Sequence, residues 1–466
     1  MKNKIIYLFF ILFSFEYSAQ NDTITLNVEE VLALVRQHHP AVKQADIAVK
    51  KSDADIMIAR GAFNPIVGAS LAHKTFGNVT YYESVAPSVT IPTWFGIEVS
   101  AGLENLSGNR LNASETVGQT GYIGVNVPLL KNLLIDKRRA YLQQSKLYRD
   151  MSVNEQKAVI NTILMDAAAQ FWLWVNAYRV HQVLSGNLEL SRQRFEMIKK
   201  TFKNGERPAI DTLEAMTQLQ TLEFQRNEAW LSFQKERLEL SVFLWQANGS
   251  PYLLPEKVIP HNGWDNETNI QNFNLNLDEL LKKAQQFNPE LKLYDQKLTS
   301  LSIDQKLKFQ ELLPKLDFKY NHLSKGYNPL ATDGFLFQNN FQYGLKLEMP
   351  LLFSQGRGEY KKAKLKIEET EWAQNQKSLQ IAAKIKYYHN EFLTLKSQVS
   401  LQRAILTNFE KLLKAEVALF KNGEGSLFLI NSRENKVLEA ERKLIEVKTK
   451  YHKTIYSLQW ATGLLQ

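Results

Sequence analysis

Residue types that perform chemistry in proteins occur in this 466-residue chain, but their spacing does not support catalysis. His38 and His39 are adjacent, and adjacent helical side chains point about 100° apart, so one metal ion cannot easily use both. Gly356-Arg357-Gly358 lacks the third glycine and the βαβ context of a dinucleotide-binding loop. No nucleophile and base have a recognisable spacing, and the chain has no cysteine. We therefore expect no catalytic residue, no metal site and no cofactor, which makes a secreted enzyme the least favoured class.

Charged residues gather instead beside two short segments of identical sequence. Phe202-Lys203-Asn204-Gly205-Glu206 recurs as Phe420-Lys421-Asn422-Gly423-Glu424. An Asn-Gly pair suits the end of a helix that closes with a left-handed residue. Asp211 follows the first segment, whereas Leu429 stands at the matching place after the second. Asp211 either serves a function at this turn or only caps the following helix.

Two basic clusters follow Val127-Pro128 and Met349-Pro350. They are Lys137, Arg138 and Arg139, and Arg357, Lys361 and Lys362. Basic side chains near anionic lipid head groups contribute about 1 kcal/mol each. The alternative is a solvated face that Asp136 and Glu359 balance. The formal net charge of +9 arises mostly from lysines and arginines that alternate with acidic residues, which does not indicate nucleic-acid binding.

The order of predicted elements occurs twice in the chain. Leu26-Asn27-Val28-Glu29-Glu30 recurs as Leu275-Asn276-Leu277-Asp278-Glu279, and Pro40 and Pro65 recur as Pro289 and Pro314. This period is far longer than the roughly 20–50 residues of a solenoid repeat. We predict a first repeat at 20–249, a linker at 250–274 that contains several prolines, and a second repeat at 275–466.

Each repeat is predicted to contain a helix, strands and a long helical hairpin. The first helices break at Pro40 and Pro289. Apolar and polar residues then alternate, as expected for strands, within about 65–128 and 315–350. Long stretches without proline follow, and the helical hairpins are predicted at about 131–248 and 355–462.

The N-terminus predicts export from the cytoplasm. Lys2 and Lys4 precede the apolar run Ile5–Phe13, and Ser18-Ala19 supplies small residues for cleavage, which is typical of a signal peptide at 1–19. No later segment has about 18 consecutive apolar residues, the length of a membrane-spanning helix. The mature protein is expected in the periplasm, outside the cell, or in an outer membrane.

This duplicated order of motifs resembles the TolC family of outer-membrane efflux proteins over essentially the whole mature chain. The resemblance implies an α+β membrane protein and a homotrimer. Each protomer would give four strands to one twelve-stranded β-barrel, which a periplasmic α-helical barrel continues. It also implies a periplasmic adaptor (membrane fusion protein), an inner-membrane RND or ABC transporter and outer-membrane lipid as partners, and no nucleic acid.

The resemblance also implies a role for the residues at the two turns. The family's tip motif is a glycine followed six residues later by aspartate, which Gly205 and Asp211 match. Leu429 and Ser432 stand where the family often has acids, and Phe420 where tyrosine is common, so a less acidic constriction is expected. The implied gate and adaptor-docking residues are Asn204, Gly205, Glu206, Asp211, Phe420, Asn422, Gly423, Glu424 and Leu429.

The expected function is therefore a passive outer-membrane channel of a tripartite efflux or type I secretion system, gated at the periplasmic helix tips. The alternative is a periplasmic coiled-coil adaptor or scaffold protein without a pore. The alternating strands distinguish the two, because an adaptor would carry a compact β-domain and a membrane anchor.

Overall fold

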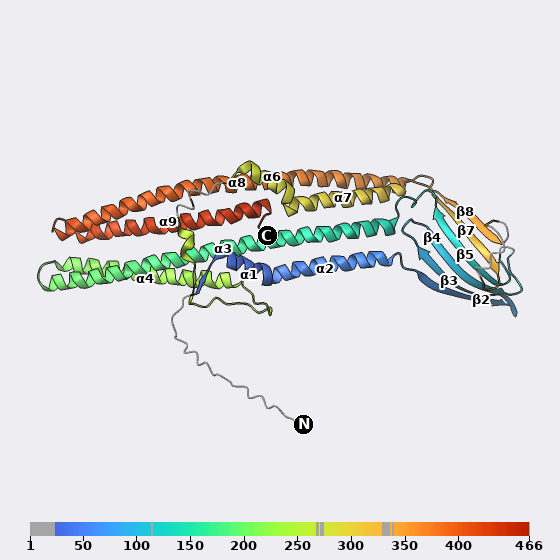
Figure 1. Ribbon diagram of the computed structural model, residues 1–466, viewed down its shortest axis with the longest axis horizontal. Coiled ribbons are helices and arrows are strands. Elements are labelled where there is room, and N and C mark those ends of the chain that lie inside the picture. The colour runs from blue at the N-terminus through green and yellow to red at the C-terminus, as the bar shows by residue number, and fades with distance from the viewer. Residues whose placement is uncertain are drawn as a thin grey trace, which may run out of the picture. The chain divides into compact units, whose positions relative to one another are not determined.

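The computed structural model describes residues 24–112, 115–266, 270, 275–328, 336–337 and 340–465. The predicted signal peptide lies outside the described residues. The chain forms two compact units, and each draws segments from both repeats (Figure 1). We call Met1–Leu34, Gln170–Asn272 and Val399–Thr449 the tip unit, and Val35–Ala169, Phe273–Gln398 and Lys450–Gln466 the sheet unit.

The predicted helix breaks at the two prolines are confirmed. Helix α1 (Val28–His38) is followed by α2 (Pro40–Gly61), and α6 (Leu277–Phe287) by α7 (Pro289–Gln310). A side chain caps each second helix: His39 Nδ1 accepts a hydrogen bond from the Ala41 amide at 3.1 Å, and Asn288 Oδ1 accepts one from the Glu290 amide at 2.9 Å. The histidine next to Pro40 therefore acts as a helix cap.

One antiparallel sheet of six strands belongs to the sheet unit. The resemblance implied four strands. The longer strand region of the first repeat adds a hairpin of β2 and β3, closed by Gly77 and Asn78 with φ of 59° and 61°, as two-residue hairpin turns require. The strands in sheet order are β2 (Ile66–Phe76), β3 (Val79–Pro92), β4 (Glu98–Ser107), β5 (Gly118–Pro128), β7 (Lys315–Lys325) and β8 (Phe341–Glu348).

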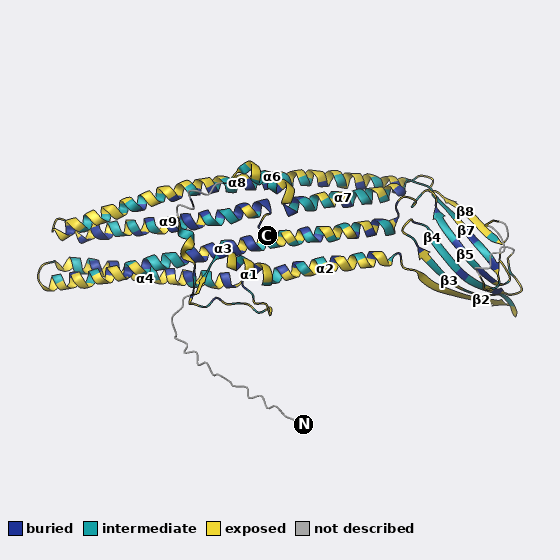
Figure 2. Ribbon diagram, in the orientation of Figure 1, coloured by how far each residue is buried: buried dark blue, intermediate teal, exposed yellow. Residues whose placement is uncertain are grey.

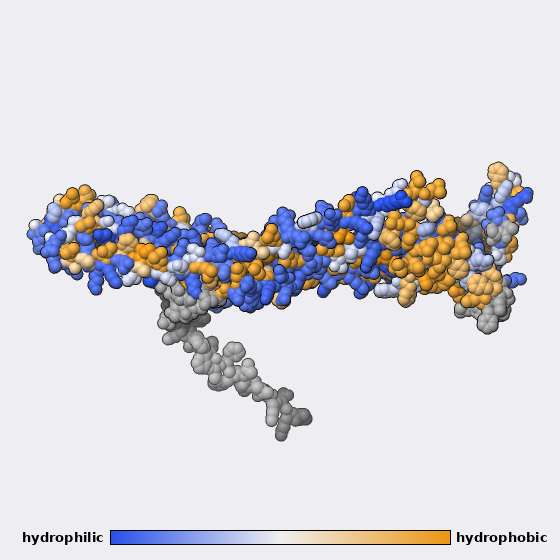
Figure 3. Space-filling view, turned by 90° about the horizontal axis from the view of Figure 1, so that it is seen from above, coloured by the Kyte–Doolittle hydropathy of each residue, from blue (hydrophilic) through white to orange (hydrophobic). Residues whose placement is uncertain are grey.

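The two faces of this sheet differ in chemistry. Ala101 in β4 pairs with Val89 in β3 and Ile123 in β5, so apolar side chains continue across three strands on one face. The neighbouring Ser100 pairs with Thr90 and Gly124 on the other face. Figure 3 shows hydrophobic residues gathered over the strands, where exposed apolar side chains include Val67, Leu71, Val85, Leu345 and Leu347.

Both edges of the sheet are open among the described residues. Strands β2 and β8 each pair on one side only, and they are almost entirely exposed (Figure 2). Unpaired backbone groups at a sheet edge are a template for pairing with another strand.

Four long helices form two antiparallel hairpins. They are α3 (Lys137–Lys203) with α4 (Ala209–Ser241), and α8 (Ser354–Lys421) with α9 (Leu427–Thr462). Helix α3 has 67 residues, which corresponds to roughly 100 Å at about 1.5 Å per residue. Its most apolar 18-residue window has a mean hydropathy of 1.3, and half of that window is buried. Phe171, Trp172 and Trp174 are buried, so the apolar character of α3 serves helix packing.

The linker carries more structure than the sequence predicted. Strand β6 (Val258–Pro260) pairs in parallel with β1 (Ile24–Leu26), and the short helix η1 spans Asn262–Asp265. The buried Lys448 Nζ lies 2.5 Å from the Asp265 carboxylate, and Arg179 lies 3.3 Å from its other oxygen. These ion pairs attach the linker to α3 and α9 within the tip unit.

Candidate tip and docking site

The two predicted turns are hairpin tips with closely similar backbones. At the end of α3, Gly205 has φ of 77° and the Glu206 amide donates to the Thr201 carbonyl at 3.0 Å. At the end of α8, Gly423 has φ of 82° and the Glu424 amide donates to the Leu419 carbonyl at 3.0 Å. Both glycines adopt the left-handed conformation that closes a helix. The predicted residues Asn204, Gly205, Glu206, Asn422, Gly423 and Glu424 are all exposed.

Arg207, which the sequence analysis missed, joins the two tips. Its guanidinium carbon lies 4.0 Å from the centre of the Phe420 ring, and its Nη2 donates to the Phe420 carbonyl at 3.3 Å. Its Nη1 lies 3.8 Å from the Asp211 carboxylate. Phe420 is only 8% exposed, so it is part of the tip core. Arg207 precedes Pro208, the N-cap of α4, so the regular spacing of helical side chains did not indicate this pair.

The structure also bears on the alternative role of Asp211. The N-cap residue of α4 is Pro208, which forms no side-chain capping hydrogen bond, and Asp211 lies in the first turn of the helix. A carboxylate there interacts favourably with the helix dipole. The exposed Leu429 takes the matching place in α9, where Ser426 Oγ accepts a hydrogen bond from the Leu429 amide at 3.3 Å.

Polar side chains fasten the first hairpin to the second. Arg194 forms a two-pronged ion pair with Glu434, with Nη1 to Oε2 at 2.5 Å. Gln218 Nε2 donates to Asn435 Oδ1 at 2.9 Å, and Asn431 Nδ2 donates to Glu214 Oε1 at 3.3 Å. These partners are more than 200 residues apart, so no spacing in the sequence could reveal them.

An apolar core supports these polar contacts. It joins Ile198 and Ala215 of the first hairpin with Phe420, Leu427 and Ile430 of the second. Burial of the isoleucine, leucine and phenylalanine side chains contributes roughly 1.5–3 kcal/mol each, so the two tips of one chain form a packed unit.

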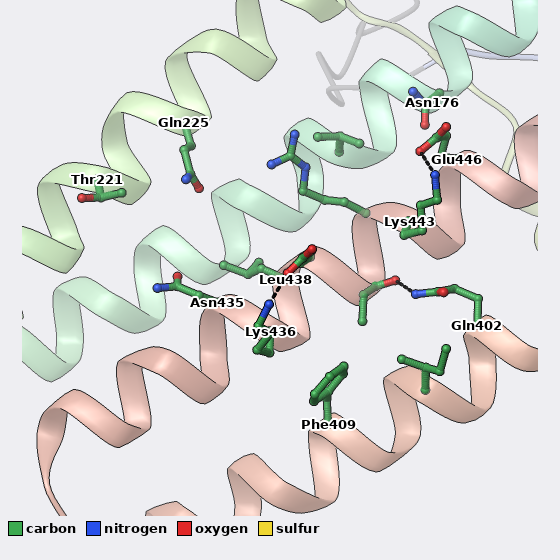
Figure 4. Close-up of a pocket in the computed structure, with 15 residues that line it drawn as sticks. Asn176, Thr221, Gln225, Gln402, Phe409, Asn435, Lys436, Leu438, Lys443 and Glu446 are labelled. Atoms are coloured by element: carbon green, nitrogen blue, oxygen red, sulfur yellow. Dashed lines mark hydrogen bonds and ion pairs between the residues drawn. The ribbon is translucent and has the colours of Figure 1, made fainter.

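A groove of about 840 Å³ lies within the tip unit (Figure 4). All four long helices line it, with Asn176, Gln225 and Gln402 from α3, α4 and α8. Along α9, Lys436 pairs with Glu439 at 2.9 Å and Lys443 with Glu446 at 3.0 Å. The lining is thus a row of amides and compensated charges around a few apolar residues, which suits a polar protein surface better than an apolar small molecule.

The basic clusters divide into engaged and exposed side chains. Arg138 pairs with Glu98 at 3.0 Å, and Arg139 donates to the Leu133 carbonyl at 3.0 Å and lies 3.4 Å from Asp136. These arginines attach the start of α3 to the strands and loops of the sheet unit. The exposed members are Lys137, Arg357, Lys361 and Lys362.

Glu359 pairs with Lys308 of α7 at 2.8 Å, so it does not balance Arg357 alone. The hydrogen bond between them lowers the pKa of Glu359 and raises that of Lys308. Within the described ranges, no group of three or more His, Asp or Glu side chains could hold a metal ion.

Comparison with known proteins shows which family and which solved structures this chain resembles. Residues 31–244 match the family model described as outer membrane efflux protein. No sequence among the curated proteins matches the chain.

Solved structures resemble nearly the whole chain. The CmeC outer membrane channel of Campylobacter jejuni is 16% identical, with a TM-score of 0.63 over 94% of this chain and 85% of that chain. The outer membrane protein VceC of Vibrio cholerae is 13% identical, with a TM-score of 0.63 over 94% and 96%. The MtrE outer membrane channel of Neisseria gonorrhoeae is 12% identical, with a TM-score of 0.63 over 94% and 89%. At these identities the likeness shows a shared fold.

The family match supplies what the fold alone does not. It covers α2, four strands of the sheet, α3 and α4, which are the elements that carry the first tip. Residues 31–244 therefore match the outer membrane efflux protein family, and nearly the whole chain shares the fold of solved outer membrane channels.

Proposed function

We propose that this efflux channel is a passive export duct of a homotrimer, which receives its substrate from an inner-membrane RND or ABC transporter through a periplasmic adaptor. The observation that carries the proposal is the six-stranded sheet, with one apolar and one polar face and two open edges. In a membrane barrel the apolar face meets lipid and the polar face lines water.

The open edges make assembly a physical requirement of this proposal. Backbone groups inside lipid must all be paired, and only a closed barrel achieves this with strands. One copy leaves β2 and β8 unpaired on one side each. Copies around an axis would pair β2 of one with β8 of the next. With six strands per copy, such a trimer would have more strands than the twelve that the resemblance implies.

The hairpin tips are the proposed gate, and the groove between the hairpins is the proposed adaptor site. The exposed turns at Gly205 and Gly423 leave the tips free to meet a partner. The groove presents amides and both signs of charge, which fit a polar helical partner. Asp211→Ala should change cation preference or gating in single-channel records, and unchanged records would remove Asp211 from the gate.

The exposed basic residues are proposed to meet anionic lipid. Lys137, Arg357, Lys361 and Lys362 are near the ends of the strands in the chain, whereas Arg138 and Arg139 are engaged within the protein. Reversal of the four exposed charges should lower insertion into membranes that contain anionic lipid. Normal insertion of that variant would contradict the proposed contact with anionic lipid.

Fractionation and mass test the proposal as a whole. After expression in a Gram-negative host, the protein should sediment with the outer membrane, and its mass in detergent should be that of three chains. A soluble periplasmic monomer would refute the export duct and favour the alternative, a coiled-coil scaffold without a pore.

A further inference from the structure

Four contacts tie the two hairpin tips of one chain together, and each includes a charged or amide side chain. They join Arg194 to Glu434, Glu214 to Asn431, Gln218 to Asn435 and Arg207 to Phe420. We call this set the inner seam.

The internal repeat gives each of these contacts a counterpart between copies. The tips are offset by 218 residues (422 minus 204), so each first-hairpin residue has an equivalent in the second hairpin. In the ring of copies that the proposed function requires, the second hairpin of one copy neighbours the first hairpin of the next. At the contact between copies, the second hairpin of one copy takes the place that the first hairpin has within a chain. The first hairpin of the next copy takes the place of the second hairpin.

Adding 218 to each first-hairpin residue and subtracting 218 from each second-hairpin residue gives the pairs expected between copies, and they differ in chemistry from the inner seam. Arg194 and Glu434 become Leu412 and Met216 of the next copy. Glu214 and Asn431 become Ser432 and Leu213, and Gln218 and Asn435 become Lys436 and Thr217. Arg207 and Phe420 become Gly425 and Phe202. No ion pair is reproduced, and the residues at the Arg194–Glu434 place are both apolar.

The exposure of these side chains in a single chain agrees with their assignment to a contact between copies. In one chain, Met216 is 43%, Leu412 45% and Phe202 41% exposed. At about 100° per residue, Met216 lies about 200° around α4 from Glu214, on the side that faces away from the second hairpin. A group of apolar side chains at such a place in a soluble region marks an interaction surface.

We infer that neighbouring copies meet at their tips through an apolar outer seam, with Leu412 of one copy against Met216 of the next. The two hairpins of a single chain are held by ion pairs and hydrogen bonds, whereas the outer seam contains no ion pair and is apolar where the inner seam has its Arg194–Glu434 pair. Opening of the tip therefore separates copies and leaves each chain's two hairpins joined. This inference rests on the proposed assembly of copies into a ring.

The sequence contains no cysteine, so the only thiols that can be cross-linked in a variant are the ones introduced. The double variant Met216→Cys/Leu412→Cys and the control Arg194→Cys/Glu434→Cys are treated in the membrane with a short bis-maleimide. A linker is preferred to a disulfide because Cα atoms more than ~7 Å apart cannot be bridged directly. Denaturing gels then report whether the bond joins chains or lies within one chain.

The outer-seam pair should shift most of the protein to the masses of two and three linked chains. The inner-seam pair should stay at the mass of one chain, with protease digestion showing an internal link. The single variants should give no shift.

Native mass and conductance of the same samples separate the two proposals. A conducting trimer whose outer-seam pair links only within a chain, or not at all, would overturn the inference and leave the proposed function intact. A monomer without conductance would overturn the proposed function first.

Discussion

Arg207 explains an asymmetry between the two tips at the scale of single residues. Its counterpart in the second repeat is Gly425, where a Cβ atom would lie 2.8 Å from the Phe420 amide nitrogen. An arginine cannot occupy that place without displacing the backbone. The second tip consequently lacks the arginine that pairs with Asp211 in the first, and Leu429 stands at the place of Asp211. The acid and the arginine are present together in one repeat and absent together in the other.

Loss of the Arg194–Glu434 pair should destabilise the tip unit. The two side chains are 19% and 15% exposed, so Arg194→Ala leaves a largely buried carboxylate without its partner. We expect a loss of about 1–3 kcal/mol in the free energy of unfolding, measured by tryptophan fluorescence in detergent.

The matched control is Lys436→Ala, which removes the exposed Lys436–Glu439 pair from α9, the helix that carries Glu434. Its effect should stay within about 0.5 kcal/mol. Equal effects of the two variants would show that the Arg194 pair contributes nothing specific.

Glu441 predicts a dependence of stability on pH. Burial, and then the charge of Glu410, raise the pKa of this carboxyl above its ordinary 4.5, against the opposing effect of Arg179 and Arg403. The folded state therefore holds the proton more tightly than the unfolded state. Its contribution to stability is present below pH 4.5 and is lost as the pH rises through the folded pKa.

Glu441→Gln removes the partly buried charge, so it should raise the melting temperature at pH 7. The difference from the parent protein should vanish below pH 4.5, where Glu441 is protonated in both states. A variant that melts lower at pH 7, or a difference independent of pH, would contradict the assignment.

Strand β4 gives the sharpest test at the scale of elements. Ala101 lies on the apolar face between Val89 and Ile123, and Ser100 lies on the polar face between Thr90 and Gly124. A lysine on the lipid face costs about 2–4 kcal/mol at the middle of the membrane. We expect Ala101→Lys to lower the yield of folded protein in lipid vesicles, whereas Ser100→Lys should fold normally. The reverse order would mean that the faces are assigned wrongly.

Elements with a strong local signature could be predicted from the sequence. The breaks at Pro40 and Pro289 follow from proline chemistry, and the long helices follow from long apolar-periodic stretches without proline. Strands β4, β5, β7 and β8 alternate clearly, and their placement was predicted closely. The first repeat's additional hairpin lies within the predicted strand region at about 65–128, but the alternation did not separate its two strands or place their turn at Gly77 and Asn78.

The ties between hairpins were beyond such prediction. Arg194 and Glu434, for example, are ordinary helix-surface residues in the sequence, and only the packing of distant segments brings them together. The predicted tip residues marked the correct turns, but the side chains that join the tips are Arg207 and the inner-seam partners. Phe420 was predicted at the gate, and the structure buries it in the tip core.

At the scale of the whole molecule, one chain combines a β-sheet with two long helical hairpins. The sheet has a lipid-compatible face and two edges that require partners, and the hairpins have polar surfaces, packed tips and a polar groove. Nothing in this arrangement requires covalent chemistry, because a duct needs only a wetted lumen and an end that opens. The duplication supplies two near-equivalent hairpins per chain, and the differences between them determine which seam can part.

Electrical recording tests the central claim most directly. Protein purified from outer membranes in detergent is added to a planar lipid bilayer, and the current through single molecules is measured. The account predicts discrete and long-lived conductance steps from a preparation with the mass of three chains. A preparation that remains monomeric and passes no current across the bilayer would contradict it.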